Sequence, residues 1–245
     1  MISSLPLVLS AKNLKKTYRG TPVVHNVSFH VRTGEVVGLL GPNGAGKTTS
    51  FGMVTGLIAN DTGTISLGHL DLSGLPMYMR ARAGIRYLPQ DTSIFRGLSV
   101  EDNIMAIIEI FHRDKAKREE VLQQLLDEFR LNDIRFKQAK VLSGGERRRV
   151  EIARSLVGSP RFLLFDEPLA GIDPKMMRDI RTLIKRLKKK DLGILITDHN
   201  VRETLAVVDR AYIINGGTIL KEGTPQDIVN DPMVQEIYLG AEFSL

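Results

Sequence analysis

A glycine-rich segment, GPNGAGKT at residues 41–48, has the residue types and spacing of a loop that binds phosphate groups. It follows a continuous apolar run, VVGLL at 36–40, and precedes a helical stretch that begins near Lys47. Glycines let backbone N–H groups turn inward around phosphate oxygens, and a helix start adds partial positive charge. The Lys47 side chain would reach the terminal phosphates, and the Thr48 hydroxyl would bind Mg²⁺. A glycine-rich turn without function is the alternative, but few chance matches would also follow an apolar strand.

Two acidic residues end a second apolar segment, FLLFDEP at 162–168. A carboxylate at the C-terminal end of a buried strand beside a phosphate loop is placed to hold Mg²⁺ directly or through water, which we assign to Asp166. The next residue, Glu167, is then free to orient or deprotonate an attacking water. Without the phosphate loop, the same pair would be read as an acidic turn at a strand end. Together, the two segments predict the hydrolysis of a nucleoside triphosphate.

A third segment, LSGGE at 142–146, starts a helix with two adjacent glycines. Ser143 and Glu146 have the spacing of a capping box, which explains those two residues as a well-started helix. It leaves Gly144 and Gly145 unexplained, because glycine costs a helix about 1 kcal/mol relative to alanine. Glycines at a helix start let a phosphate approach the free N–H groups closely. The chain therefore has a second helix start suited to phosphate, this one without a lysine.

Strand and helix patterns alternate along the chain, which predicts an α/β fold with a mainly parallel sheet flanked by helices. Residues 27–31 alternate apolar and polar, as in a half-buried antiparallel strand. Continuous apolar runs at 162–165, 193–197 and 211–214 predict buried parallel strands. An apolar stripe predicts an amphipathic helix over 175–190, and the segment from about 99 to 157 is mostly helical.

The composition of the chain restricts the class of protein to which it can belong. The 245 residues are 42% hydrophobic and 25% charged, as expected for a globular protein, and the net charge of +6 is a modest excess. With no cysteine, disulfides, iron–sulfur clusters and thiol catalysis are excluded. The first residues lack the pattern of a signal peptide, and no apolar run has the length of a membrane span. We therefore expect any role at a membrane to depend on partners.

The order of these motifs resembles that of the ATP-binding cassette (ABC) ATPases. The matching segments are GPNGAGKT, YLPQ (87–90), LSGGE, FLLFDEP, AGIDP (170–174) and TDHN (197–200). The resemblance implies a P-loop NTPase fold with an antiparallel β lobe and a helical subdomain. It further implies one ABC ATPase domain over 1–245, with core and β lobe at about 7–98 and 158–245 and the helical subdomain at about 99–157. In that family two domains pair head to tail, and the LSGGE segment of one closes on ATP held by the phosphate loop of the other.

The resemblance also implies a role for each matching residue. Tyr18 would stack on adenine, Gln90 would contact Mg²⁺ and the water, and His199 would hold the γ-phosphate. Asp173 would lie at the dimer seam. Taken alone, the tyrosine could be a core residue, the glutamine a surface residue and the histidine an ordinary polar residue. The implied catalytic residues are Glu167, His199, Lys47 and Gln90, and the implied metal-binding residues are Thr48, Gln90 and Asp166. The other implied ATP-site residues are Gly41, Pro42, Asn43, Gly44, Ala45, Gly46, Lys47, Thr48, Thr49, Ser143, Gly144, Gly145 and Asp173.

Longer runs, such as LSGGERRRVEIARSL, GIRYLPQDTSIFRGLSVEDN and ITDHNVRETLAVVDRAYII, are similar to the ATPase subunits of lipopolysaccharide export transporters of Gram-negative bacteria. This similarity implies a homodimer under two integral membrane subunits, peripheral on the cytoplasmic face of the inner membrane. It places Phe95 and Arg96 at the surface that meets those subunits, although the phenylalanine could instead pack inside the helical part. The C-terminal tail, with Tyr238 and Phe243, is also similar, but Ala241 and Ser244 replace the acidic and basic residues expected there.

Three alternatives remain open. The ATPase of a branched-chain amino acid importer shares the YLPQ-like loop and a YLG-type ending, but its signature usually differs from SGGERRR. ABC ATPases that act on nucleic acid or ribosomes usually carry coiled-coil insertions or a second cassette, and neither is present here. A metabolic P-loop kinase would leave LSGGE and TDHN unexplained. The basic helix at 178–190 has its charges opposite its apolar stripe, so we interpret it as a solvated face and expect no nucleic acid partner.

Overall fold

The structure is a computed structural model that describes residues 6–170 and 172–240. Ala241, Phe243 and Ser244 of the predicted tail lie outside these residues. The strands are β1 (Val8–Tyr18), β2 (Thr21–Arg32), β3 (Val36–Leu40), β4 (Thr62–Leu67), β5 (Leu70–Asp71), β6 (Ile85–Leu88), β7 (Phe162–Asp166), β8 (Gly193–Thr197), β9 (Arg210–Asn215) and β10 (Thr218–Gly223). The helices are α1 (Lys47–Thr55), α2 (Met77–Arg82), α3 (Val100–Phe111), α4 (Lys115–Glu128), α5 (Gly144–Leu156), α6 (Pro174–Lys189), α7 (Val201–Leu205), α8 (Pro225–Val229) and α9 (Pro232–Val234). A π-helical turn, η3 (Gln235–Leu239), follows α9.

The strands form a sheet in the order β5-β4-β1-β2-β10-β9-β3-β8-β7-β6. From β9 to β6, neighbouring strands run parallel, whereas β5, β4, β1 and β2 pair antiparallel. The apolar runs predicted as buried strands are β3, β7, β8 and β9, and the alternating run at 27–31 lies in β2. The predicted α/β fold, with a mainly parallel core and an antiparallel lobe, is confirmed.

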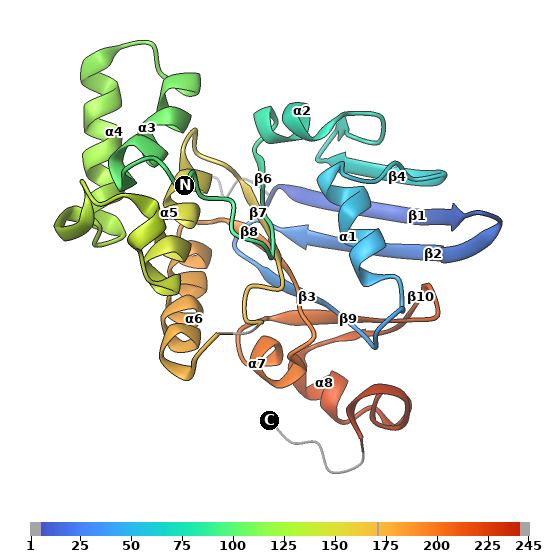
Figure 1. The fold of residues 1–245 in the computed structure, drawn as a ribbon. Coiled ribbons are helices and arrows are strands. Elements are labelled where there is room, and N and C mark those ends of the chain that lie inside the picture. The colour runs from blue at the N-terminus through green and yellow to red at the C-terminus, as the bar shows by residue number, and fades with distance from the viewer. Residues whose placement is uncertain (1–5, 171, 241–245) are drawn as a thin grey trace, which may run out of the picture.

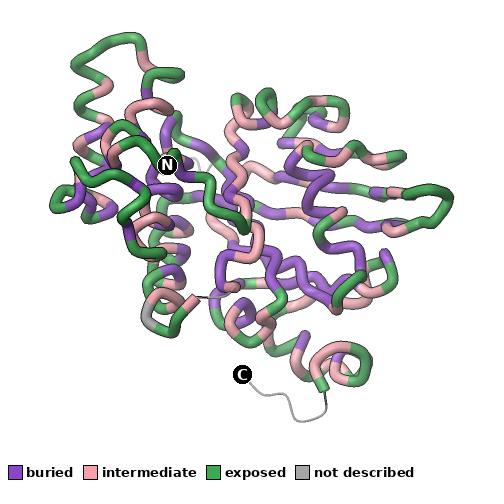
Figure 2. Tube along the Cα trace, viewed as in Figure 1, coloured by how far each residue is buried: buried purple, intermediate pink, exposed green. Residues whose placement is uncertain are grey.

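Two apolar cores lie on opposite faces of the parallel strands, because successive side chains of a strand point to opposite sides. In β3, Val37 and Leu39 join the core that contains α1 and the antiparallel lobe. Val36 and Leu40 join the other core, which α6, α7 and the helical segment complete. Figure 2 shows the parallel strands as the most continuously buried part of the chain. The phosphate-loop helix and the helix after FLLFDEP therefore cover different faces of one rigid sheet.

Helices α3, α4 and α5 lie together on one side of the molecule, away from the β1–β2 hairpin (Figure 1). Ser99 caps α3 by accepting a hydrogen bond from the Asp102 amide. The apolar face of α4 is buried through Leu122, Leu125 and Leu126. Among residues 6–170 and 172–240, no helix is long and apolar enough to cross a membrane.

Candidate functional site

Four sequence motifs meet at one edge of the sheet because they follow four neighbouring parallel strands. The phosphate loop follows β3, His199 comes two residues after β8, Glu167 directly follows β7, and Gln90 comes two residues after β6. In space the order of these strands is β3-β8-β7-β6. Ligands of open α/β sheets bind outside the C-terminal ends of their strands. The topology thus gathers residues that are far apart in the sequence.

The phosphate loop has the backbone that its glycines were expected to provide. Gly41, Gly44 and Gly46 have φ angles of 148°, 77° and 101°, values that favour glycine. A methyl group on Gly41 would lie 2.0 Å from the carbonyl oxygen of Ile214, so no larger residue fits there. Helix α1 starts at Lys47 without a side-chain cap. Its first N–H groups are therefore left for an anion.

The ammonium group of Lys47 is folded back onto its own loop. It donates hydrogen bonds to the carbonyl oxygens of Gly41, at 2.7 Å, and of Pro42, at 2.9 Å. Burial lowers the pKa of Lys47, and the negative charge of Glu167 partly offsets this effect. The loop thus holds a buried cation beside the predicted general base, at the place where phosphate charge would be received.

The two acidic residues after β7 differ in their surroundings. The Tyr87 hydroxyl donates to Asp166 across 3.1 Å. Burial raises the pKa of Asp166, which this hydrogen bond opposes. Glu167 has a φ of 45°, a left-handed conformation that is strained for a residue other than glycine. Strain of this kind collects at functional sites, because the surrounding fold must hold it in place.

Glu167 and His199 contact each other directly. The Nδ1 atom of His199 lies 3.2 Å from Oε2 of Glu167. An ionised carboxylate can only accept, so in this contact Nδ1 carries the hydrogen. The turn at Glu167 is also fixed by its amide, which donates to the Thr197 carbonyl across 2.7 Å. The structure therefore brings together the predicted base and the predicted γ-phosphate ligand.

The sequence analysis missed Asp198, which organises both of these strand ends. It is fully buried, and its carboxylate accepts hydrogen bonds from the amides of Leu169, at 2.9 Å, and Asn200, at 2.8 Å. Burial raises the pKa of Asp198, and the two backbone hydrogen bonds oppose the rise. One carboxylate thus ties the segment after Glu167 to the segment after His199. The available signal was an acidic residue directly after GILIT, a strand that is apolar except for its last residue.

Gln90, Glu167, Gly144 and Asp173 line one cleft of about 390 Å³ between the sheet edge and the start of α5. Asp173 precedes α6 and accepts a hydrogen bond from the Met176 amide across 3.0 Å. Gln90 itself is exposed. The cleft therefore joins the predicted base and the predicted metal contact to the predicted dimer seam and one glycine of the LSGGE segment.

The start of α5 is the predicted capping box. The Ser143 hydroxyl accepts from the Glu146 amide, and Glu146 accepts from the Ser143 amide across 2.7 Å. A methyl group on Gly144 would lie 3.7 Å from Sδ of Met176, and one on Gly145 would lie 3.9 Å from its Cγ; both are ordinary contacts. Neither glycine has a positive φ. Nothing among the described residues requires glycine at either position.

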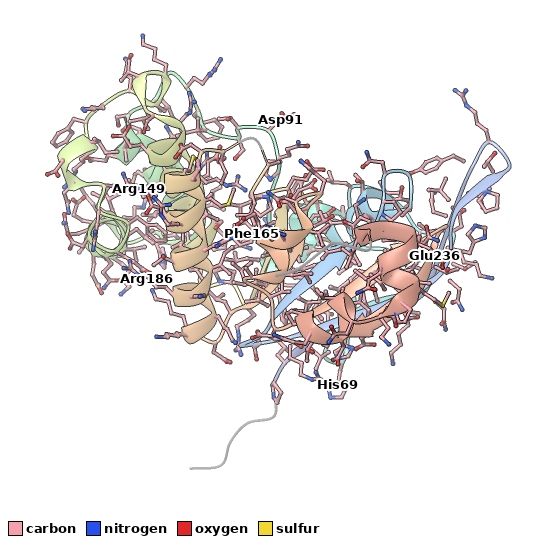
Figure 3. The ribbon with its side chains drawn as sticks, turned by 90° about the horizontal axis from the view of Figure 1, so that it is seen from below. His69, Asp91, Arg149, Phe165, Arg186 and Glu236 are labelled. Carbon is pink, nitrogen blue, oxygen red and sulfur yellow. The ribbon has the colours of Figure 1, made fainter. Side chains whose placement is uncertain are left out.

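Both glycines also line a groove of about 580 Å³ between α5 and α6. Figure 3 shows this side of the molecule, with Arg149 of α5 and Arg186 of α6 labelled and Phe165 of β7 at the centre. The start of α5 is thus open on two sides, to the cleft and to the groove. A ligand or a second protein could approach it without any rearrangement of the core.

Several predicted residues lie away from this cleft. Tyr18 ends β1 and is exposed, so it is not a core residue. Phe95 is also exposed, which excludes packing in the interior of the helical part. The Arg96 side chain is exposed, while its carbonyl accepts from the Lys140 amide across 3.1 Å. None of the three lines the cleft that holds Gln90 and Glu167.

A row of charged residues on α5, also missed, fastens that helix to the Gln90 loop. Arg148 donates to the Pro89 carbonyl across 3.2 Å. Glu151 accepts from the Ser93 amide across 2.7 Å, and Arg154 donates to the Ser93 carbonyl across 2.9 Å. The Arg154 guanidinium also lies over the Phe95 ring, 4.4 Å from its centre. The spacing of three residues was visible in the sequence, but its partner segment was not.

The oxygen donors at the sheet edge suit Mg²⁺ only in combination with a ligand. Within the described ranges, no group of three or more His, Cys, Asp or Glu residues could hold a metal ion. Asp166 offers a half-buried carboxylate whose charged form is disfavoured, Thr48 a hydroxyl and Gln90 an amide oxygen. Mg²⁺ is usually bound by one or two carboxylates together with substrate phosphates. These residues fit such a shared site.

A phosphate loop between a parallel strand and a helix, beside acidic residues at the next strand ends, defines a P-loop nucleoside triphosphatase. Comparisons with known proteins narrow this class. Residues 24–170 match the family described as "ABC transporter", and residues 222–244 match that described as "Branched-chain amino acid ATP-binding cassette transporter". The chain belongs to the ABC transporter family of ATP-binding proteins. This confirms the predicted family, and with it an ATPase of the transporter type that binds adenine nucleotide.

Individual relatives are similar over nearly the whole chain. A probable ABC transporter ATP-binding protein of Azorhizobium caulinodans is 57% identical over 97% of this chain and 84% of its own length. The lipopolysaccharide export system ATP-binding protein LptB of Escherichia coli is 53% identical over 97% of this chain and 99% of its own length. A crystal structure of an ABC transporter cassette in its ADP conformation is 27% identical, with a TM-score of 0.85 over 97% of this chain and 100% of that one.

Proposed function

We propose that the chain is the ATP-hydrolysing subunit of a transporter that extracts lipopolysaccharide from the inner membrane and exports it towards the outer membrane. The observation that carries this proposal is the 53% identity to a lipopolysaccharide export protein over 97% of this chain and 99% of that protein. The matched length includes the helical segment and the Gln90 loop, where ABC ATPases that serve different transporters would be expected to differ. Under this proposal the protein is peripheral, on the cytoplasmic face, and binds two integral membrane subunits.

A branched-chain amino acid importer is the second candidate, and one observation favours it. Residues 222–244 match the tail described for that class of cassette. This segment is short, whereas the likeness to the export proteins covers nearly the full chain. A pull-down of the chain from membranes of its own cells, followed by mass identification, distinguishes the two. Two lipopolysaccharide-export membrane subunits would support the first proposal, and importer permeases would support the second and overturn the first.

The proposed chemistry assigns one task to each group at the sheet edge. Lys47 and the loop amides bind the β- and γ-phosphates, and Tyr18 stacks on adenine. Thr48, Asp166 and Gln90 would hold Mg²⁺, which neutralises phosphate charge when bound. Phosphoryl transfer needs mainly positioning and charge stabilisation.

Glu167 is the proposed general base. Its contact with His199 at 3.2 Å supports separate roles for the two side chains. When ATP binds, the histidine would turn to the γ-phosphate, and the carboxylate would then be free to contact a water. The strained backbone at Glu167 supports the same assignment. We expect ATP binding to draw His199 away and Glu167 to take a proton from the in-line water. The water oxygen then bonds to the γ-phosphorus as the bond between that phosphorus and the β–γ bridging oxygen breaks, which gives inorganic phosphate and leaves ADP with its phosphates among the loop amides and Lys47.

Glu167→Gln tests this assignment. The variant should bind ATP, because the phosphate loop is intact, but turnover should fall at least about a hundredfold since general base catalysis is lost. It should also accumulate as an ATP-bound dimer, measured by size-exclusion chromatography with light scattering. Glu109→Gln, at an exposed position of α3, is the matched control and should keep wild-type turnover. Unchanged steady-state turnover in Glu167→Gln would contradict the assignment of Glu167 as the general base.

We further propose a head-to-tail homodimer in which Ser143, Gly144 and Gly145 of one protomer contact the ATP of the other. The support is that both glycines have room for a methyl group within their own chain and lie at an open helix start. Asp173 would lie at the seam between the protomers. Phe95 and Arg96 would meet the membrane subunits, and the exposed ring of Phe95 supports this placement. A strictly monomeric preparation should be a poor ATPase.

A further inference from the structure

Tyr87 belongs to the YLPQ segment, in which the family resemblance implies a role only for Gln90. It lies in β6, the strand at one edge of the sheet (Figure 1). There it pairs with Leu164 of β7, two residues before Asp166. Tyr87 and Leu164 both pack in the core that contains α1. Because side chains two residues apart on a strand point to the same face, Asp166 lies on the same face of the sheet as Tyr87.

The Tyr87 side chain has a partner at each end. Its hydroxyl donates a hydrogen bond to Oδ2 of Asp166 across 3.1 Å. Its ring packs against the ring of Phe51, with 6.1 Å between the ring centres and the planes tilted by 58°. Phe51 is fully buried in α1, about one turn after Lys47. Tyr87 therefore connects the helix of the phosphate loop to the acidic end of β7.

The three residues that would hold Mg²⁺ come from elements that Tyr87 joins. Thr48 lies in α1, Asp166 ends β7, and Gln90 comes two residues after β6. A neutral hydroxyl holds a carboxylate without cancelling its charge, whereas an arginine or a lysine would cancel it. Within the described ranges, Asp166 forms no ion pair, and its other oxygen, Oδ1, accepts no hydrogen bond. One oxygen is therefore fixed, and the other is left for a cation.

We propose that Tyr87 is a positioning residue for the metal site, whose hydroxyl orients the Asp166 carboxylate so that Oδ1 receives Mg²⁺. Groups that hydrogen-bond a metal-binding carboxylate set its orientation, and their loss typically weakens metal binding about 10–100-fold. A phenylalanine ring would pack against Phe51 equally well, so the hydroxyl is the part of Tyr87 that this role requires. The inference deepens the proposed ATPase function, because it rests on the Mg²⁺ site proposed there.

Tyr87→Phe removes the hydroxyl and keeps the ring. Isothermal titration calorimetry with ADP, once with Mg²⁺ and once with EDTA, separates the effect of the metal from that of the nucleotide. In the wild type, Mg²⁺ should tighten the binding of ADP. In Tyr87→Phe this gain should shrink about tenfold, while the Kd in EDTA should stay within about twofold because the phosphate loop is unchanged. The Mg²⁺ concentration that gives half-maximal ATP turnover should also rise about tenfold.

Tyr212→Phe is the matched control, because it also removes the hydroxyl of a buried tyrosine, one that lies 3.1 Å from Nδ1 of His30. It should lower Tm and leave the response to Mg²⁺ at the wild-type value, as expected for a hydroxyl with a merely structural role. An unchanged Mg²⁺ response in Tyr87→Phe would overturn the role of Tyr87. An equal loss of affinity with Mg²⁺ and with EDTA would overturn it too, because the hydroxyl would then act on the phosphate loop.

ADP binding and ATP turnover are measured separately, so this inference and the proposed function can fail separately. A wild-type chain that does not hydrolyse ATP would reject the proposed function, and the ADP titrations would still decide the role of Tyr87. A wild type that hydrolyses ATP, but whose affinity for ADP does not respond to Mg²⁺, would overturn the role of Tyr87 alone.

Discussion

Two helix starts in this chain are rich in glycine, but the surrounding structure restricts the residue type at only one of them. At the start of α1, Gly41 and Gly46 have positive φ angles, and an added methyl group would lie 2.0 Å from the Ile214 carbonyl oxygen or 2.9 Å from the Val23 carbonyl oxygen. At the start of α5, Gly144 and Gly145 have ordinary helical backbone and room for a methyl group. The first pair is required by the chain's own fold. Nothing in the described chain requires the second pair, which we propose serves a phosphate group that approaches from outside.

The two helices also differ in whether a side chain caps their first turn. Helix α1 has no side-chain cap, and the Lys47 ammonium lies on its own loop carbonyls, so its free N–H groups await an anion. Helix α5 has a complete capping box, so its start is stable without a ligand. Because the start of α5 is already capped, glycine is needed there only if a ligand must approach the backbone closely. Substitutions at the two starts should therefore separate stability from activity.

Gly41→Ala should have the largest effect on stability. The new methyl group would meet the Ile214 carbonyl, and the backbone conformation disfavours alanine, so we expect a loss of about 3 kcal/mol or more. Urea unfolding followed by circular dichroism measures this loss. Gly44→Ala is the matched control within the same loop, because it has a positive φ but nothing within 4 Å. It should lose only about 1–2 kcal/mol. Equal losses in the two variants would contradict the crowding at Gly41.

Gly144→Ala should leave the fold intact and damage activity. Alanine at a helix position costs less than glycine, so the free energy of unfolding should stay the same or rise by up to about 1 kcal/mol. ATP turnover should fall about tenfold or more, because the methyl group holds the partner's phosphate away from the helix start. Steady-state phosphate release and urea unfolding, measured on one preparation, give both numbers. If Gly144→Ala had normal turnover, close approach of the partner's phosphate could not be the reason for glycine at this position.

Mixing two variants of low ATPase activity tests whether the second helix start serves the other protomer. In a mixed dimer of Gly144→Ala with Lys47→Ala, one of the two ATP sites has both its lysine and its glycine intact, and the other has neither. Random mixing should restore up to about a quarter of wild-type turnover. No recovery above the separate variants, in a preparation shown to form mixed dimers, would argue that each chain supplies its own glycine.

The sequence predicted those parts of the site that depend on local pattern. An apolar strand, a glycine loop and a lysine are adjacent in the chain, so their order alone placed the phosphate loop and the start of α1. The capping box at Ser143 and Glu146 was predicted for the same reason. The edge where the motifs meet also followed, because parallel strands align their C-terminal ends.

Other parts of the site depend on contacts between distant segments. The hydrogen bond from the Leu169 amide to Asp198 crosses between neighbouring strand ends, and the one from Arg154 to the Ser93 carbonyl joins a helix to a loop. Neither pairing has a signature in one sequence. The left-handed backbone at Glu167 was equally hidden, since a glutamate there gives no hint of a positive φ. What the sequence lacks is the geometry that holds the predicted catalytic groups in place.

The smallest expected effect is a pH dependence that only the capped helix start should show. Hydrogen bonds from the Ser143 hydroxyl and amide lower the pKa of Glu146 from its ordinary value of 4.5. A lowered carboxyl pKa means that the capping box adds its full stability above pH 4.5, and that this stability is lost as the pH falls through the native pKa. The loss should be about 1 kcal/mol, the usual worth of a cap.

Glu146→Gln keeps the shape of the capping box and removes the titration. Urea unfolding between about pH 3 and 7 should then show a shallower acid loss in the variant than in the wild type. Helix α1 gives the contrast. Burial lowers the pKa of Lys47, so its neutralisation adds stability only as the pH rises through the native value towards 10.5, far from the acid range. If the free energy of unfolding of wild type and of Glu146→Gln fell in parallel towards acid pH, the carboxylate would not be what stabilises the start of α5. The comparison of the two helix starts would then rest on their glycines alone.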